Sequence, residues 1–270
     1  MTKIARYRLA PKNWPRGLKL RIVALSDIHA DWPWMTPARI GRICAEANEL
    51  APDIVLLLGD FVHGVRTWAR PVPTGEWAAA LATLRAPLGI HAVLGNHDWW
   101  EDEEGQRTLK GPVEARRALE TAGISVYEND ARKIGEFWIA GVADQRPLER
   151  FDRGQHYDGP SLADLPKTLA QVTDDAPLIL MLHEPDIFPD VPPRVTLTLA
   201  GHTHAGQIRL PFLPLATSSR FGERYAYGHI REEGRDMIVS AGLGFSDLPL
   251  RINAPPEIVM VELGEADAGW

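Results

Sequence analysis

The sequence predicts an α/β fold in which helices cover a layered β-sheet. Wholly apolar runs, typical of buried strands, alternate with segments whose apolar residues recur at helical spacing. Each apolar run also ends in polar residues, and ligands of α/β sheets gather beyond the carboxyl ends of strands. A chain of 270 residues, 45% of them hydrophobic, is long enough for one large domain with a sizeable core. Because there is no internal repeat, low-complexity tract or change of composition, we expect a single domain over residues 1–270.

Three strands and two helices are predicted in the first hundred residues. The strands are expected over 18–25, 53–58 and 89–94, and the helices over 37–50 and 75–84. Thr36 and Pro37 are typical of a helix start, because a hydroxyl can cap the first turn and proline fits it. The single cysteine, Cys44, falls on the apolar face of this helix, where we expect it to be buried.

The rest of the chain predicts one longer helix, one short helix and a longer series of strands. The helix is expected over 113–122, and the strands over 124–127, 137–141, 177–182, 195–200, 207–210, 236–241 and 257–263. Residues 143–165 are rich in Asp, Arg, Gly and Pro, and we expect a loop there with a short helix after it. Residues 211–224 predict an irregular excursion.

Charge and composition exclude some classes of protein. The formal net charge is −7, whereas binders of duplex nucleic acid are usually basic, so we expect no nucleic-acid partner. One cysteine excludes an intrachain disulfide. The N-terminus lacks the apolar core of a signal peptide, and no stretch approaches the roughly 18 apolar residues of a spanning helix. We therefore expect a cytoplasmic protein, with peripheral contact at the inner membrane face left open.

Polar groups follow five of the predicted strands in the same manner. They are Asp27 with His29, Asp60, Asn96 with His97, His183, and His202 with His204. Each group alone has an ordinary explanation as a helix cap, a turn residue or a core histidine. Five such groups in one chain instead indicate a metal site. Carboxylate, amide and imidazole ligands suit two divalent ions such as Mn, Fe, Zn or Ni, and two ions roughly 3.5–4 Å apart serve displacement at phosphorus.

The ordered motifs resemble those of the calcineurin-like metallophosphoesterase superfamily. The resemblance covers residues 20–263 and rests on Asp27-x-His29, Gly59-Asp60, Gly95-Asn96-His97-Asp98, His183 and Gly201-His202-x-His204. The form Gly-His-Thr-His-Ala-Gly-Gln is similar to small bacterial single-domain members, a branch with membrane-associated and lipid-pathway hydrolases, among them a class acting on UDP-2,3-diacylglucosamine. The resemblance implies a four-layer αββα sandwich of two mixed β-sheets flanked by helices, with the metal site at the C-terminal ends of strands.

The resemblance also implies a role for each motif residue. The first metal ion would take Asp27, His29, Asp60 and His204, and the second would share Asp60 and add Asn96, His183 and His202. His97 would contact the phosphate and protonate the leaving group, while Asp98 would hold its other ring nitrogen. Imidazole suits this task because it titrates near neutral pH. No ligand of the set is missing, which argues against a relative that only binds.

The function expected from these roles is hydrolysis of a phosphodiester or pyrophosphate bond by hydroxide that bridges the two ions, on a small or lipid-linked substrate. A phosphomonoesterase or nucleotidase of the same fold is the first alternative. A metal-stabilised interaction module without catalysis is the second. The sequence does not identify the substrate, because the loops determine which substrate is recognised.

Several residues near the motifs have two interpretations. His63 either supports the site from behind or is an ordinary polar loop residue. The tryptophans at 32, 34, 99 and 100 either pack loops against the sheet or form an apolar wall for a nucleoside or acyl chain. Residues 211–215 are a candidate lid or membrane anchor. Arg220 and Arg224 are candidates for binding a second phosphate or a carboxylate.

Overall fold

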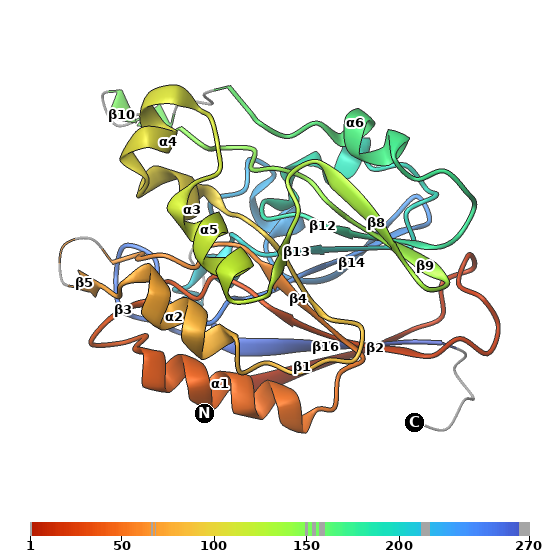
Figure 1. The fold of residues 1–270 in the computed structure, drawn as a ribbon, viewed down its shortest axis with the longest axis horizontal. Coiled ribbons are helices and arrows are strands. Elements are labelled where there is room, and N and C mark those ends of the chain that lie inside the picture. The colour runs from red at the N-terminus through yellow and green to blue at the C-terminus, as the bar shows by residue number, and fades with distance from the viewer. Residues whose placement is uncertain are drawn as a thin grey trace.

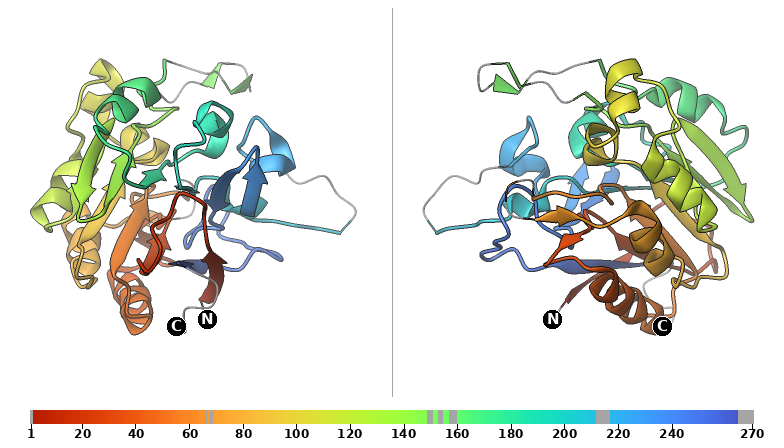
Figure 2. Two further views of the ribbon diagram at one scale, coloured as in Figure 1. Left: turned by 90° about the vertical axis from the view of Figure 1, so that its right-hand side faces the viewer. Right: turned by 60° about the vertical axis from the view of Figure 1, so that its left-hand side comes forward.

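Two six-stranded β-sheets pack face to face, and helices cover their outer faces (Figure 1). This arrangement is seen in a computed structural model that describes residues 2–65, 67, 69–148, 151–152, 155–156, 160–211 and 217–264. In Figure 1 helices α1 and α2 lie on one side of the sheets and α6 on the other, and Figure 2 shows the same layers from two further sides. The predicted α/β class and mixed sheets are confirmed.

The first sheet has a parallel half and a mixed edge. Its strand order is β1 (Lys3–Leu9), β16 (Glu257–Leu263), β2 (Leu20–Leu25), β4 (Ile54–Leu58), β6 (Ile90–Val93) and β7 (Ser125–Val126). Strands β2, β4, β6 and β7 run parallel, while β16 is antiparallel to β2 and parallel to β1. The carboxyl ends of β2, β4 and β6 therefore lie side by side.

The second sheet has four parallel strands between two antiparallel edges. Its order is β14 (Gly228–Glu232), β15 (Arg235–Val239), β13 (Leu197–Ala200), β12 (Leu178–Met181), β9 (Phe137–Gly141) and β8 (Asp130–Ile134). Strands β15, β13, β12 and β9 are parallel, and β14 and β8 reverse direction. Two short ribbons are formed by β3 (Asp31–Trp32) with β5 (Arg70–Pro71) and by β10 (Phe151–Asp152) with β11 (Gln155–His156).

Alternate residues of each inner strand face different layers. In β4, Leu56 packs between the two sheets, whereas Val55 and Leu57 pack against helices. This follows from the two-residue period of a strand, and a strand covered on both faces is apolar throughout. The three resulting apolar layers are helix on sheet, sheet on sheet, and sheet on helix. They make the four-layer sandwich that the resemblance implied.

The helices begin and end where local sequence allows. Helices α1 (Pro37–Glu49), α2 (Thr74–Leu81) and α5 (Glu114–Thr121) cover the first sheet, and α6 (Leu165–Ala170) and η1 (Pro185–Asp190), a 3-10 helix, cover the second. Helices α3 (Asn96–Trp100) and α4 (Glu103–Thr108) follow β6, and η2 (His204–Gly206) and η3 (Gly222–Tyr225) are further 3-10 turns. Thr36 caps α1 as predicted by accepting the N–H of Arg39, and Cys44 is buried on its inner face.

The prediction of a strand over 207–210 is wrong. Ile208 forms a single bridge to Ile252, because Ala205 and Gln207 have positive φ angles that a strand does not accept. Within the ranges that the structure describes, no helix is both long and apolar enough to cross a membrane.

Candidate metal centre

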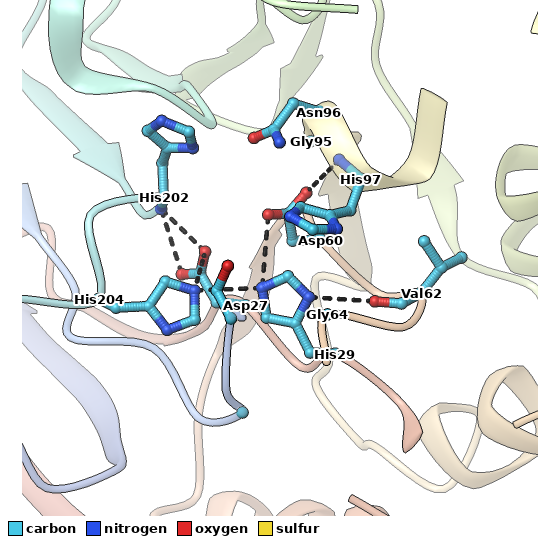
Figure 3. A network of polar contacts seen from close by, with 12 residues as sticks. Asp27, His29, Asp60, Val62, Gly64, Gly95, Asn96, His97, His202 and His204 are labelled. Carbon is cyan, nitrogen blue, oxygen red and sulfur yellow. Dashed lines mark hydrogen bonds and ion pairs between the residues drawn. The ribbon is translucent and has the colours of Figure 1, made fainter. Parts of the chain in front are cut away.

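The polar groups that follow five strands meet in one buried space, and Figure 3 shows four of these groups, those of Asp27 with His29, Asp60, Asn96, and His202 with His204. In the first sheet, Asp27 and His29 follow β2, Asp60 follows β4, and Asn96 follows β6. In the second sheet, His183 follows β12, and His202 and His204 follow β13. These seven residues are called the candidate ligands below. None of them is more than 7% exposed. Burying so many polar side chains is costly unless each one has a partner.

The backbone is strained where it carries the candidate ligands. Asp27, His29, Asp60, His202 and His204 all have positive φ, between 46° and 70°. Such left-handed angles are unfavourable for residues other than glycine, and strain of this kind gathers at functional sites. Hydrogen bonds between loops stabilise this strained backbone. The N–H of Asp27 donates to the carbonyl of Gly59, and the N–H of His29 donates to the carbonyl of Asp60, both at 3.0 Å. The loops therefore turn sharply at each strand end and aim these side chains inward.

A glycine beside the ligands allows the two sheets to approach. A Cβ atom at Gly95 would collide with Asp60 Oδ1 and with the ring of His183, which comes from the other sheet. Only glycine leaves room for both side chains. The glycine of the Gly95-Asn96 motif is thus required by the packing of ligands.

The first cluster joins Asp27, His29 and His204. The Nε2 atoms of His29 and His204 lie 3.1 Å apart, and His204 Nε2 is 3.4 Å from Asp27 Oδ1. His29 Nε2 also lies 3.5 Å from Asp60 Oδ2. Asp60 is therefore at the border of this cluster.

The second cluster joins Asp60, His183 and His202. His183 Nε2 lies 3.2 Å from Asp60 Oδ2, 3.2 Å from Asn96 Oδ1 and 3.3 Å from His202 Nδ1. The same oxygen of Asp60 thus faces both clusters. A third grouping, His29, Asp60 and His97, overlaps the first and places the ring of His97 at its edge.

Backbone carbonyls fix the tautomers of two histidines. His29 Nδ1 donates to the carbonyl of Val62 at 3.1 Å, and His183 Nδ1 donates to that of Leu58 at 2.7 Å. Because a carbonyl oxygen only accepts, each Nδ1 carries a hydrogen, and Nε2 is the atom that each ring turns toward Asp60. A buried carboxylate that faces two imidazole nitrogens is stabilised by a positive charge between them, which is either a proton or a metal ion. The residues therefore fit divalent metal ions.

Electrostatics keep most of the imidazoles in the form that binds metal. Burial lowers the pKa of His29 to about 3, and with the nearby charge of Arg251 it holds the pKa of His204 well below its usual range. Burial also raises the pKa of Asp27 to about 6. At His183 burial lowers the pKa, but the charge and hydrogen bond of Asp60, together with the charges of Glu184 and Asp27, outweigh it and raise the pKa of His183 well above its usual range. A cation in place of that proton would satisfy the same carboxylate.

The structure corrects the role expected of Asp98. Its carboxylate accepts backbone N–H groups of Asp60, Phe61, Val62 and Gly95, at 2.9 to 3.2 Å, and does not hold the ring of His97. The partner of His97 Nδ1 is instead the carbonyl of His63, at 3.1 Å. The prediction failed because Asp98 is the third residue of helix α3, where its side chain turns back toward the N-terminus and away from its neighbour.

The hydrogen bond between His97 Nδ1 and the carbonyl of His63 also decides between the two interpretations of His63. Its carbonyl supports His97, so the residue backs the site through its main chain, while its ring lies 3.7 Å from Asp31 Oδ2. Trp99 is buried and packs in the core, whereas Trp100 lies with its ring 4.9 Å from that of His97. Trp32 is 40% exposed. The packing interpretation thus holds for Trp99, while the apolar wall stays a prediction for Trp32, Trp34 and Trp100.

The two arginines proposed from sequence have different surroundings. Arg224 makes a paired contact with Glu232, which occupies its guanidinium, whereas Arg220 Nη2 donates to the carbonyl of Asp186. Residues 212–215, within the candidate lid, lie outside the described residues.

Sequence reasoning missed two arginines that touch ligands. Arg146 Nη1 lies 3.2 Å from His202 Nε2, and Arg251 Nη2 lies 3.0 Å from His204 Nδ1. A signal for Arg146 was present in the sequence: Asp144-Gln145-Arg146 follows strand β9 just as the ligand groups follow their strands. Arg251 follows no strand and had no comparable signal.

The fold and site together define a class of protein. Ligands of imidazole, carboxylate and amide without any thiolate are unlike a structural cysteine–zinc site. Their place at the strand ends of a two-sheet sandwich is where α/β enzymes bind substrate. The fold and the site are thus those of an α/β sandwich protein with a candidate metal centre at its strand ends.

Comparison with known proteins makes the class specific. The calcineurin-like phosphoesterase family matches residues 20–206. The chain is 30% identical to a metallophosphoesterase of Bacillus subtilis, YkuE, over 92% of this chain and 81% of that protein, and 30% identical to a metallophosphoesterase of Aquifex aeolicus, over 97% and 91%. The chain belongs to the calcineurin-like phosphoesterase family, whose members are metal-dependent phosphate-ester hydrolases.

A vertebrate relative is longer than this chain. The protein of Danio rerio named transmembrane protein with metallophosphoesterase domain is 31% identical over 98% of this chain, which spans 58% of that protein's length. None of these three relatives has a name that specifies a substrate or a lipid pathway. The expected likeness to lipid-pathway hydrolases is therefore not confirmed.

Proposed function

We propose that this protein hydrolyses a phosphodiester or pyrophosphate bond with two divalent ions, chosen from Mn, Fe, Zn and Ni. The observation that carries the proposal is the position of Asp60. Its Oδ2 atom lies 3.5 Å from His29 Nε2 and 3.2 Å from His183 Nε2, so one carboxylate oxygen faces an imidazole nitrogen from each of the two sheets. Such an oxygen can be shared by two ions that lie close together, as a two-ion site requires.

The candidate ligands divide around Asp60. The first ion would be held by Asp27, His29, Asp60 and His204, and the second by Asp60, Asn96, His183 and His202. When bound, such ions lower the pKa of water and neutralise charge on phosphate oxygens. The protein's part is to hold these donors in place, and the carbonyls behind His29 and His183 do so.

His97 is proposed as the acid that protonates the leaving group. Its Nδ1 is fixed by the carbonyl of His63, and its ring packs edge-on against His29, with ring centres 4.7 Å apart. When the ring is fully protonated, the second hydrogen is on Nε2, which is the proton that can be given to a departing oxygen. After transfer the remaining Nδ1–H stays bonded to the carbonyl, which favours the neutral tautomer that results.

The alternatives differ in substrate or in catalysis. A phosphomonoesterase would use the same residues on a more highly charged phosphate. An interaction module would have no need for His97 at the edge of the clusters, and its place there disfavours that alternative. We also propose a cytoplasmic protein acting on a small or lipid-linked substrate, with peripheral contact at the inner membrane face. No nucleic-acid partner is proposed, since the net charge is −7.

The test uses purified protein, metal analysis and two artificial substrates. We expect about two bound divalent ions per chain, hydrolysis of bis-p-nitrophenyl phosphate in the presence of Mn, and loss of that activity with a chelator. Faster hydrolysis of p-nitrophenyl phosphate than of the diester would favour the monoesterase. Bound metal without hydrolysis of either substrate, under each of the four ions, would favour the interaction module and refute the proposal.

A further inference from the structure

A cleft of about 500 Å³ opens beside the second cluster. Residues from three loops line it, among them Arg146 from the loop after β9, Glu184 and Asp186 after β12, and Ser218 and Arg220 after β13. Arg146 joins this cleft to the metal centre, because its Nη1 atom lies 3.2 Å from His202 Nε2. A group bound in the cleft would therefore lie next to the candidate ligands. We call this cavity the arginine cleft.

Contacts on several sides hold Arg146 in place. Its backbone N–H donates to Asp144 Oδ1 at 2.7 Å, and its carbonyl accepts the indole N–H of Trp100 at 2.8 Å. Its Nη1 also donates to the carbonyl of Ser218 at 3.4 Å. Because Trp100 packs against His97, the same tryptophan places both the proposed acid and the main chain of Arg146. A guanidinium positioned in advance loses little freedom when it binds an anion.

The carboxylates of the arginine cleft are already engaged or buried. Asp186 accepts the hydroxyl of Ser219 at 2.5 Å and the backbone N–H of Arg220 at 3.0 Å. Glu184 is 1% exposed, and its Oε2 accepts the backbone N–H of Gln145. Arg220, in contrast, is exposed, and its Nη2 donates to the carbonyl of Asp186. That contact uses one of the five N–H donors of a guanidinium. The guanidinium of Arg220 therefore retains N–H donors that can reach an anion in the cleft.

We propose that the arginine cleft binds a second phosphate group of the substrate, beyond the phosphorus that is attacked. This inference rests on the proposed function, since the metal ions would hold the first phosphate. Arg146 and Arg220 supply the planar donors that suit phosphate oxygens. The substrate class that follows is a diphosphate, in which two phosphorus atoms are joined through one oxygen. A simple phosphodiester would leave the cleft without an anion.

The experiment compares two inhibitors that cannot be hydrolysed. Methylphosphonate has one phosphorus and methylenediphosphonate has two, and both are tested against hydrolysis of bis-p-nitrophenyl phosphate at saturating Mn. In the wild type we expect the diphosphonate to bind at least about tenfold more tightly. In Arg146→Met and in Arg220→Met we expect that advantage to fall about tenfold, the effect of losing one charged hydrogen-bonding partner. Chelation of Mn by the diphosphonate affects every variant alike, so it cancels from the comparison.

The matched control is Arg224→Met, because Arg224 lies on the same segment but is paired with Glu232. It should keep the wild-type ratio of inhibition constants. Inorganic pyrophosphate and UDP, used as further competitors, separate a bare diphosphate from a nucleotide as the preferred occupant. Metal content, measured for Arg146→Met, shows whether the contact with His202 was needed for the ions.

The inference is overturned if both arginine variants weaken the two inhibitors equally, or if neither variant changes the ratio. Failure of the proposed function gives a different result, because then the wild type itself hydrolyses nothing. In that case calorimetric titration of methylenediphosphonate into wild type and Arg220→Met still tests the cleft, and equal affinity would refute it.

Discussion

The carboxylate of Asp98 holds the backbone of Asp60: its Oδ2 atom accepts the N–H of Asp60 at 2.9 Å. Asp98 lies on helix α3 after β6, and Asp60 lies two residues beyond the end of the neighbouring strand β4. The same carboxylate also accepts N–H groups from Phe61, Val62 and Gly95. One buried side chain thus fixes the loop on which the shared carboxylate of the metal centre depends.

The first prediction concerns this support. Asp98→Asn replaces acceptor oxygens with an NH2 group that faces backbone donors, and should lower the free energy of unfolding by at least about 2 kcal/mol. Urea denaturation of the metal-free protein measures this. The exposed Asp175→Asn is the matched control and should change stability by less than about 0.5 kcal/mol. Lower turnover with unchanged stability would instead restore a role for Asp98 in orienting His97.

The second prediction concerns His97. His97→Ala should lower the turnover of bis-p-nitrophenyl phosphate roughly 10²–10⁴-fold, because it removes the proposed acid, while metal content stays near that of the wild type. Elemental analysis and steady-state kinetics measure the two effects. His229→Ala, a change on edge strand β14 where the ring contacts Asp236, should alter neither. Loss of both ions from His97→Ala would show that His97 is a ligand.

The third prediction concerns Asp60. Asp60→Asn removes the charge that both clusters share. The number of metal ions bound per chain should therefore fall by more than one, and hydrolysis should be lost. A ligand that binds only the folded state stabilises it by about 2.7 kcal/mol at 100 times its Kd. Mn should therefore raise the Tm of the wild type, and the rise should vanish in the variant. A variant that retains one ion at full affinity would contradict a shared role.

The fourth prediction concerns Cys44. Burial raises the pKa of its thiol to about 11, so the thiolate that reacts with Ellman's reagent is scarce in the folded protein at pH 8. We expect slow labelling in native buffer and fast labelling in 8 M urea. Raising the pH toward the folded pKa should speed native labelling. Complete labelling of the native protein within minutes at pH 8 would show that helix α1 opens readily.

Much of the metal centre was predictable because its signal is local. An apolar strand followed at once by a polar side chain marks each candidate ligand, and all seven lie where their strands end. The role of Asp98 was not predictable, since it depends on which backbone donors from β4 come near it. Arg146 and Arg251 were missed because their importance comes only from contact with His202 and His204.

The fold was predictable where strands are buried on both faces. Strands β2 and β4 are nearly wholly apolar and were found, whereas β1, β8 and β14 were not. Those three lie at sheet edges and mix charged residues with apolar ones, as a polar loop does as well. Edge strands become recognisable only when their neighbours are known.

Because the metal centre takes ligands from both sheets, the packing between the sheets affects the geometry of the centre. The first sheet delivers Asp60 and the second delivers His183, so side chains between the sheets, such as the fully buried Leu56, set how far apart the two halves of the metal centre stand. Leu56→Ala should cost about 2–5 kcal/mol of stability, and it should also change the ion-to-ion spacing seen by X-ray absorption. Leu88→Ala, partly exposed outside this layer, should do neither. The apolar layer between the sheets would then set the distance between the two metal ions.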